Sequence, residues 1–241
     1  LPNGGIYEYM TDQNYKAAKN TIKRVVFSNG VAIIADDLTG ANDTALQFHL
    51  KGCSTKVLTN YKNIEKRITI VSTAQLEAKK RAKEAAVSIL ENLNAEYIYK
   101  KIDSTIRGNI SAEITGIIEA GEYDAAVVIP AFPNEGRITV GGYHLLKGVP
   151  IERTEFARDP QAPIYDSHIP TVLAGLPLET KDKVALIELN TVKQGAGPIL
   201  AKLNELIAGG KKLIVADAVS SVDIEQVMLA IYKSNSKVLP C

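Results

Sequence analysis

Two adjacent carboxylates follow a short apolar run, and their types and spacing give them a clear potential for chemistry. Asp36 and Asp37 come directly after the uninterrupted run at 31–35, which is typical of a strand buried on both faces of a parallel sheet. Ligands of open α/β sheets bind at the carboxyl ends of strands. Like charges this close repel unless hydroxyl groups, a cation or an arginine hold them. We therefore predict a binding or catalytic function for the pair.

A plainer alternative is that one of these residues only caps the helix that follows. Asp and Thr are common at the N-terminal cap, where the side chain accepts a backbone hydrogen bond, and both Asp37 and Thr39 stand in a suitable position. One cap does not account for two carboxylates together with Asn42 and Asp43. The two interpretations are compatible, because a carboxylate of the site can also cap the helix.

A second polar turn repeats this organisation with cations in place of most carboxylates. It lies between a predicted strand at 96–102 and a predicted helix at 111–120, and its polar residues are Lys100, Lys101, Asp103, Ser104, Thr105, Arg107 and Asn109. Arg107 offers a planar fork that suits a carboxylate or phosphate, and the N–H groups at the start of the helix favour an anion there. The alternative is a structural ion pair of Arg107 with Asp36 or Asp37. A site for a polyhydroxy acid needs both signs of charge, so both can hold.

A long segment rich in Gly and Pro follows the next predicted strand. We expect a loop at 130–142, a small β-hairpin formed by 143–147 and 149–154 around Gly148, and another loop at 155–166. The segment could be a surface decoration that only packs on the domain. Arg137 and Arg158 occupy positions held by Gly and Pro, which favours a lid that faces an anion.

The elements that position these turns alternate along the chain. Strands are predicted at 54–59, 69–73, 125–131, 184–189 and 212–216, helices at 41–48, 77–93, 197–208 and 222–232, and one more apolar segment at 237–240. The pattern predicts an α/β fold, with an open, mostly parallel sheet flanked by helices (Rossmann-like) and a small β-hairpin insertion. We expect an N-terminal extension at 1–24 and one α/β domain at 25–241.

Composition excludes several classes of function. A net charge of +1 gives no electrostatic footprint for nucleic acid or for an anionic membrane. No apolar run approaches the ~20 residues needed to span a bilayer, and the first thirty residues do not resemble a secretory signal, so we expect a cytoplasmic protein. The two cysteines and three scattered histidines do not predict a metal site.

Four motifs in order resemble the N-terminal domain of the four-carbon acid sugar kinases. They are Ile34-Ala-Asp-Asp-Leu-Thr-Gly-Ala-Asn-Asp43, Lys100-Lys-Ile-Asp-Ser-Thr-Ile-Arg-Gly-Asn109, Pro130-Ala-Phe-Pro133 with Gly136-Arg-Ile-Thr-Val-Gly-Gly-Tyr143, and Thr154-Glu-Phe-Ala-Arg-Asp-Pro160. The resemblance implies ATP-dependent phosphorylation of acids such as threonate, erythronate or 3-oxo-tetronate. It also implies that this domain binds the acid, while a C-terminal domain, absent from this chain, binds ATP and Mg²⁺. A homodimer is a further expectation. The family's Thr-Asp-Ser-Arg-like turn has no counterpart after Ser72-Thr73.

The resemblance, together with the charges above, gives each residue an expected role. Asp36 and Asp37 are the expected catalytic residues: they accept hydrogen bonds from vicinal hydroxyls, and one orients or deprotonates the attacking oxygen. The expected substrate-binding residues are Thr39, Asp103, Ser104, Arg107, Asn109, Arg137 and Arg158. A phosphatase of the haloacid dehalogenase type needs Asp-x-Asp-x-Thr, and Ala35 stands where its first Asp would be. A sugar-acid binding or sensor module without catalysis remains the alternative.

Overall fold

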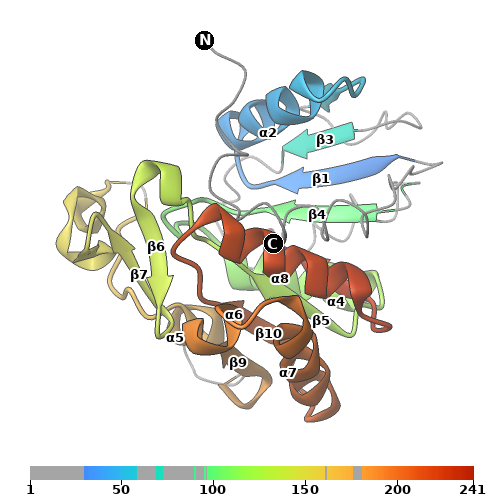
Figure 1. Ribbon diagram of the computed structural model, residues 1–241. Coiled ribbons are helices and arrows are strands. Elements are labelled where there is room, and N and C mark those ends of the chain that lie inside the picture. The colour runs from blue at the N-terminus through green and yellow to red at the C-terminus, as the bar shows by residue number, and fades with distance from the viewer. Residues whose placement is uncertain are drawn as a thin grey trace, which may run out of the picture.

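The computed structural model describes residues 30–58, 69–72, 97–160, 162–175 and 181–241, together with the single residues 90 and 95 (Figure 1). The predicted extension at 1–24 and nearly all of the helix predicted at 77–93 lie outside the described residues. Among the helices that are described, none is long and apolar enough to cross a membrane.

The first sheet carries the strand that leads to Asp36. It consists of four parallel strands in the order β2 (Lys56–Leu58), β3 (Thr69–Ser72), β1 (Val31–Ala35) and β4 (Tyr97–Lys101). All five residues of β1 are buried, as the apolar run predicts. The helix α2 (Leu38–Leu50) lies against β1 (Figure 1) and contributes Ala41 and Ala45 to the small core on this side. Small side chains let a helix approach a sheet closely.

A second sheet holds the later strands of the chain. Its order is β11 (Val238–Pro240), β5 (Ala125–Val128), β10 (Leu213–Ala216) and β9 (Val184–Ile187), and all of its pairs are parallel. The predicted α/β class with parallel strands is confirmed, while the described strands pair in two hydrogen-bonded sheets rather than one. β11 contacts β4, which brings the edges of the two sheets together.

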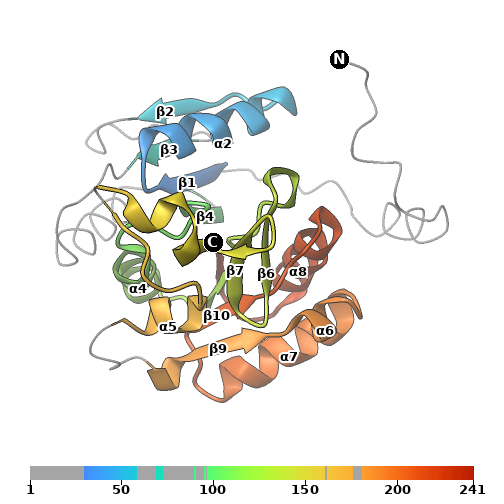
Figure 2. The same cartoon turned by 90° about the vertical axis from the view of Figure 1, so that its left-hand side faces the viewer.

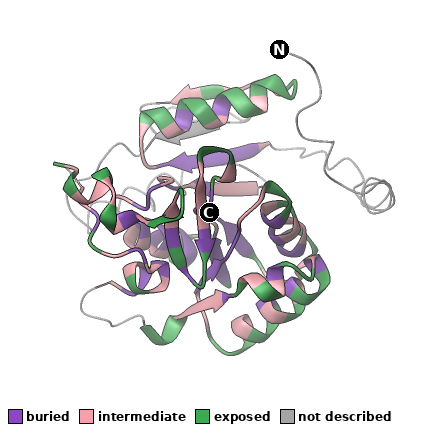
Figure 3. Cartoon of the chain, turned by 60° about the vertical axis from the view of Figure 1, so that its left-hand side comes forward, coloured by how far each residue is buried: buried purple, intermediate pink, exposed green. Residues whose placement is uncertain are grey.

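Helices cover the second sheet and close the main cores (Figure 3). On one side, α7 (Ala196–Ala208) and α8 (Ser221–Lys233) pack on the strands, and the short α6 (Leu189–Val192), which precedes α7, contacts both helices. On the other side, α4 (Ile110–Ala120) and α5 (Ile169–Ala174) share a core with residues of both sheets. Because Ile34 of β1 and Val128 of β5 belong to that core, α4 packs against residues of both sheets.

A three-stranded antiparallel sheet projects beside the second sheet (Figure 2). It contains β6 (Arg137–Val140), β7 (Tyr143–Leu146) and β8 (Val149–Pro150). The predicted hairpin around Gly148 is confirmed as the β7–β8 pair. Two expectations are wrong: β6 lies within a predicted loop, and the second hairpin strand ends at Pro150. The Gly residues read as loop signals instead bound β6, since Gly136 and Gly141 have positive φ at its two ends.

Short 3₁₀ helices make up the connections after these strands. η1 (Pro133–Glu135) precedes β6, η2 (Ile151–Arg153) and η3 (Glu155–Arg158) follow β8, and η4 (Lys181–Lys183) precedes β9. The expected loop at 155–166 therefore starts with a helical turn. Thr154 is the N-terminal cap of η3, and its side chain accepts a hydrogen bond from the N–H of Phe156.

Candidate functional site

The first polar turn combines a helix cap with a second carboxylate. Asp37 is the N-terminal cap of α2, and its side chain accepts a hydrogen bond from the N–H of Gly40. Asp36 Oδ1 accepts the N–H of Asp37 at 3.1 Å. The cap alternative is therefore right for Asp37 and does not account for Asp36. Thr39 is exposed in the first turn of α2.

Burial controls the ionisation of Asp36. The pKa of its carboxyl group is raised above the ordinary value, mainly because burial disfavours the charged form, while the positive charges of Lys100 and Lys101 act in the opposite direction. A carboxylate with a raised pKa takes up a proton more readily at neutral pH. The two neighbouring carboxylates therefore differ: burial makes Asp36 more basic than an ordinary carboxylate, while Asp37 is held as the acceptor of the Gly40 N–H.

Asp103 organises the second polar turn with its own side chain. Asp103 Oδ2 accepts the hydroxyl of Thr105, the N–H of Arg107 at 3.1 Å and the Nε–H of Arg107 at 2.9 Å. The backbone closes the turn through the N–H of Ile106, which donates to the Asp103 carbonyl at 2.9 Å. Ile106 has a φ of 59°, a left-handed conformation that is costly for a β-branched residue. The turn is thus held in one strained conformation by several hydrogen bonds.

Arg107 is bound by two carboxylates from different parts of the chain. Its Nε and Nη2 contact Asp103 at 2.9 and 3.3 Å, and its Nη1 lies 2.7 Å from Asp159 Oδ2. The guanidinium group also lies over the ring of Phe156, 5.5 Å from its centre. Although burial opposes ionisation of Asp103, the hydrogen bonds from Arg107 and Thr105 outweigh it and lower the pKa of that carboxyl group. The sequence suggested that Arg107 could pair with Asp36 or Asp37. In the structure it pairs with Asp103 and Asp159 instead.

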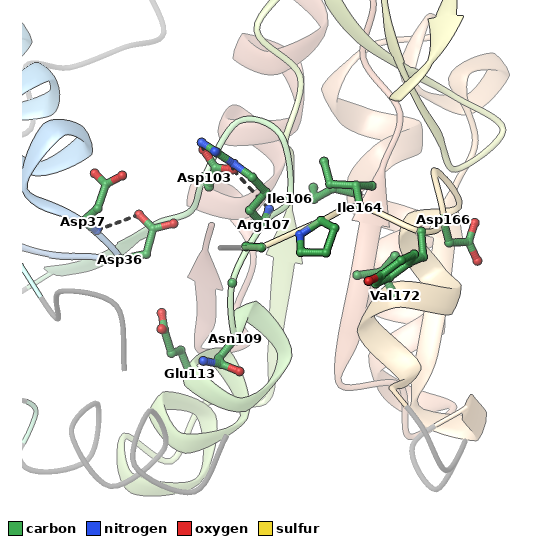
Figure 4. Close-up of a pocket in the computed structure, with 14 residues that line it drawn as sticks. Asp36, Asp37, Asp103, Ile106, Arg107, Asn109, Glu113, Ile164, Asp166 and Val172 are labelled. Atoms are coloured by element: carbon green, nitrogen blue, oxygen red, sulfur yellow. Dashed lines mark hydrogen bonds and ion pairs between the residues drawn. The ribbon is translucent and has the colours of Figure 1, made fainter. Parts of the chain in front are cut away.

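The two polar turns line one cavity of about 760 Å³ (Figure 4). One side carries Asp36 and Asp37, and the middle carries Arg107 and the start of α4. The opposite side is the segment 162–166 with Val172 of α5. The parallel pairing of β1 with β4 explains why the turns meet, because Ala35 lies opposite Lys101 and both strands therefore end at the same edge.

The structure divides the predicted site residues into two groups. The described residues that line this cavity include Asp36, Asp37, Asp103, Arg107 and Asn109. Thr39, Ser104, Arg137 and Arg158 are not among them, and the side chain of Arg158 is exposed. Sequence reasoning did not single out Glu113, Ile164 or Asp166, which also line the cavity. In the sequence, Glu113 is one polar position within a predicted helix, and 162–166 is part of a predicted loop without a recognisable motif. Neither therefore indicated a binding function.

A buried ion pair stands behind part of the cavity wall, since one of its members, Glu113, is a lining residue. Lys100 is completely buried, and its Nζ lies 2.6 Å from Glu113 Oε2 and 2.9 Å from the carbonyl oxygen of Lys101. This pair joins β4 to α4. The side chain of Lys101 lies near Gly40 of α2. A Cβ added to Gly40 would stand 3.4 Å from Lys101 Nζ and 3.1 Å from Asp37 Oδ1. A residue larger than Gly at position 40 would crowd both charged groups.

The antiparallel sheet is attached to the second polar turn through a buried histidine. His144 on β7 has no exposed surface; its Nε2 lies 2.8 Å from the Ser104 carbonyl oxygen and its Nδ1 lies 3.3 Å from Thr139 Oγ1. A carbonyl oxygen can only accept, so Nε2 carries the proton and Nδ1 accepts from Thr139. Burial lowers the pKa of His144, which favours this neutral form.

The loop between β6 and β7 is fixed by another buried carboxylate. Asp217, at the end of β10, accepts the N–H groups of Gly141 at 2.7 Å, Gly142 at 2.9 Å and Leu189 at 3.0 Å. Asp217 directly follows the strand predicted at 212–216, and the sequence does not indicate its partners. Within the part of the chain that the structure describes, no group of three or more His, Cys, Asp or Glu residues could hold a metal ion.

Comparison with known sequences finds a matching domain family and relatives that are curated as sugar-acid kinases. The family model described as the sugar-binding N-terminal domain matches residues 31–240. The D-erythronate kinase of Heliobacterium modesticaldum is 36% identical over 88% of this chain and 50% of its own length. The D-threonate kinase of Salmonella typhimurium is 37% identical over 80% of this chain and 46% of its own length. The chain therefore spans about half the length of these curated relatives.

Solved structures share the fold. A Bordetella bronchiseptica protein, described as a domain of unknown function with bound citrate and as a domain-swapped dimer, superposes with a TM-score of 0.72 at 29% identity, over 87% of this chain and 52% of that one. A Salmonella typhimurium protein described as a putative tRNA synthase gives a TM-score of 0.78 at 21% identity, over 88% and 52% of the two chains, which supports the fold alone. The match of the family model over nearly the whole described region shows that this chain belongs to the family of sugar-binding N-terminal domains.

Proposed function

We propose that this domain binds a four-carbon sugar acid for an ATP-dependent kinase, of which the chain forms the acid-binding part. The observation that carries the proposal is the shared cavity, in which the carboxylates of Asp36 and Asp37 lie across from the guanidinium group of Arg107. A hydroxylated acid needs acceptors for its hydroxyl groups and a cation for its carboxylate. The names of the relatives, erythronate and threonate kinases, describe substrates of that chemistry.

The residues of the cavity have distinct parts in this proposal. Asp37, fixed as a helix cap, and Asp36 accept hydrogen bonds from neighbouring hydroxyl groups of the acid. Asp36 takes the proton of the hydroxyl that becomes phosphorylated, because burial raises its pKa. Arg107 and the start of α4, where Asn109 and Gly108 line the cavity, face the carboxylate of the acid. The citrate in the Bordetella relative is likewise a hydroxylated acid.

ATP and Mg²⁺ belong to the proposal through the rest of the protein. Mg²⁺ in kinase sites is bound largely by the phosphates of the nucleotide together with one or two carboxylates, and the relatives are about twice as long as the stretch they share with this chain. When bound, ATP supplies the phosphoryl group, and Mg²⁺ neutralises its charge. The domain described here holds the acid, orients the reacting hydroxyl and accepts its proton. The possible homodimer and the cytoplasmic location stay predictions from sequence.

Calorimetry on the whole protein tests the binding site. We expect D-erythronate and D-threonate to bind, and Asp36→Asn and Arg107→Ala each to weaken binding by about tenfold or more, since each removes a charged hydrogen-bond partner. The matched controls are Asp182→Asn and Arg153→Ala, which change exposed residues that do not line the cavity. Unchanged affinity in both site variants would remove these residues from the site.

Turnover distinguishes a kinase from a module that only binds. ATP consumption coupled to acid phosphorylation, measured with Mg²⁺ and each acid, is expected for the whole protein. In the same assay Asp36→Asn should lower kcat by about 10²- to 10⁴-fold, the contribution of a general base. Binding of the acid with no turnover in the wild type would favour the sensor alternative.

A further inference from the structure

The ion pair between Arg107 and Asp159 occupies the part of the guanidinium group that an acid substrate needs. An arginine presents five N–H donors in a fixed plane, and a carboxylate binds best to an edge that offers two of them. Asp103 takes one such edge, through Nε and Nη2. The remaining two-donor edge is formed by Nη1 and Nη2, and Asp159 already bonds to Nη1 at 2.7 Å.

Asp159 comes shortly before the segment 162–166, which lines the cavity opposite the two polar turns. It ends η3, and its Oδ1 accepts the N–H of Ala162 at 2.9 Å. Ala162 is the first of the cavity-lining residues of the segment 162–166, and the N–H of Ile164 donates to the Phe156 carbonyl at 3.2 Å. The two oxygens of Asp159 therefore link this segment to Arg107, so the ion pair joins the 162–166 side of the cavity to its middle.

The two bonds of Arg107 differ in how firmly the chain holds them. Asp103 is four residues away, and it also accepts Thr105 and the N–H of Arg107, so its position is fixed by the turn itself. Asp159 is separated from Arg107 by 52 positions and lies in a connection between short helical turns. The side chains of Arg107 and Asp159 are 32% and 21% exposed, so water and small anions can reach the pair.

We propose that Asp159 stands in for the substrate carboxylate on Arg107 and leaves the guanidinium group when an acid binds, so that Asp159 sets the affinity of the cavity for anions. This inference rests on the proposed function. In the structure, Arg107 Nη1 donates to one oxygen of Asp159. In the complex, the two oxygens of the incoming carboxylate accept from Nη1 and Nη2. The net charge of the group formed by Arg107, Asp103 and Asp159 is negative, so the displacement also relieves repulsion between Asp159 and the incoming acid.

The test compares three forms of the whole protein and two ligands by calorimetry. Asp159→Asn keeps the shape of the side chain and an oxygen for the Ala162 N–H but removes the competing charge. Asp166→Asn is the matched control, because Asp166 is a carboxylate that lines the cavity and, like Asp159, its Oδ1 accepts a backbone N–H, that of His168. D-Erythronate is the anionic probe, and erythritol is the neutral probe of the same length.

We expect Asp159→Asn to bind D-erythronate about two- to fivefold more tightly than the wild type, the range covered by measured, partly exposed ion pairs. Asp166→Asn should gain less, and erythritol should bind all three forms alike. An equal or weaker affinity of Asp159→Asn for the acid, or an equal gain for erythritol, overturns the inference. If the wild type binds the acid in that case, the proposed function stands. If the wild type binds no acid, both fail.

Hydrogen exchange provides a measurement that needs no variant. The N–H of Ala162 is protected by Asp159 in the structure. If the acid displaces Asp159, saturating D-erythronate should speed the exchange of this amide in the wild type, while erythritol should leave it unchanged. Slower or unchanged exchange with the acid would show that Asp159 stays on Arg107.

Discussion

The ammonium group of Lys100 lies 2.6 Å from the carboxylate of Glu113, and the two side chains are 0% and 6% exposed. Lys100 belongs to β4, which ends at the second polar turn, and Glu113 belongs to the first turn of α4. The contact therefore fixes the strand and the helix that flank Arg107 relative to each other. Because Glu113 also lines the cavity, the pair connects the stability of the fold to the geometry of the site.

Removing one partner of this pair should destabilise the protein strongly. We expect Lys100→Met to lower the free energy of unfolding by about 3–5 kcal/mol, because it leaves the charge of Glu113 buried and unpaired. The double variant Lys100→Met with Glu113→Leu should recover a large part of that loss. Urea unfolding measures both, with Lys202→Met as a control in an exposed pair. A single variant as stable as the wild type would contradict the assigned burial.

Stability should fall below pH 6.5 through His144. Burial lowers the pKa of its imidazole in the folded protein, so the unfolded chain, with a pKa near 6.5, binds a proton first as the pH falls. The contribution of the neutral imidazole is thus complete above about pH 6.5 and is lost as the pH falls toward the folded pKa. We expect His144→Gln to flatten the unfolding free energy between about pH 6.5 and 5. His49→Gln, at an exposed position, is the control and should keep the wild-type slope.

Two neighbouring glycines separate backbone strain from steric contact. Gly141 and Gly142 have φ values of 60° and 77°, so an alanine at either position is strained by about 1–2 kcal/mol. A Cβ at Gly142 would also stand 3.1 Å from Pro170 Cδ and 3.2 Å from His168 Nε2, whereas nothing lies within 4 Å at Gly141. Gly142→Ala should therefore lose more unfolding free energy than Gly141→Ala in denaturant titrations. Equal losses would mean that α5 yields to the added methyl group.

The buried carboxylate of Asp217 should tolerate substitution poorly. It accepts three backbone N–H groups, and Asp217→Asn would turn an amide donor toward at least one of them. We expect a loss of about 1–3 kcal/mol in the free energy of unfolding, the cost of a buried donor without an acceptor. Thermal and urea unfolding check this value, and Asp182→Asn at the surface is the comparison. A neutral effect would require the turn at Gly141 to rearrange, which a crystal structure of the variant would show.

The local elements of the fold were largely predictable from sequence. The strand at 31–35, the helix after it, and the strand–helix alternation from 184 to 233 follow from apolar runs and spacing that depend on near neighbours in the chain. β6 was missed because Gly136 and Gly141 stand at its ends, and the sequence does not distinguish a Gly that bounds a strand from a Gly within a loop. The site was predictable as far as its two polar turns, since each follows a strand.

The sequence by itself determined where the charged turns stand, which residue types they carry, and the family to which they belong. Only the tertiary structure decided which side chains meet. It paired Arg107 with Asp159 across 52 positions, brought Asp166 into the cavity, and left Arg158 exposed. The physical reason is that contacts between distant residues depend on strand order and on the packing of α4 against residues of both sheets, and neither leaves a periodic signal in the chain.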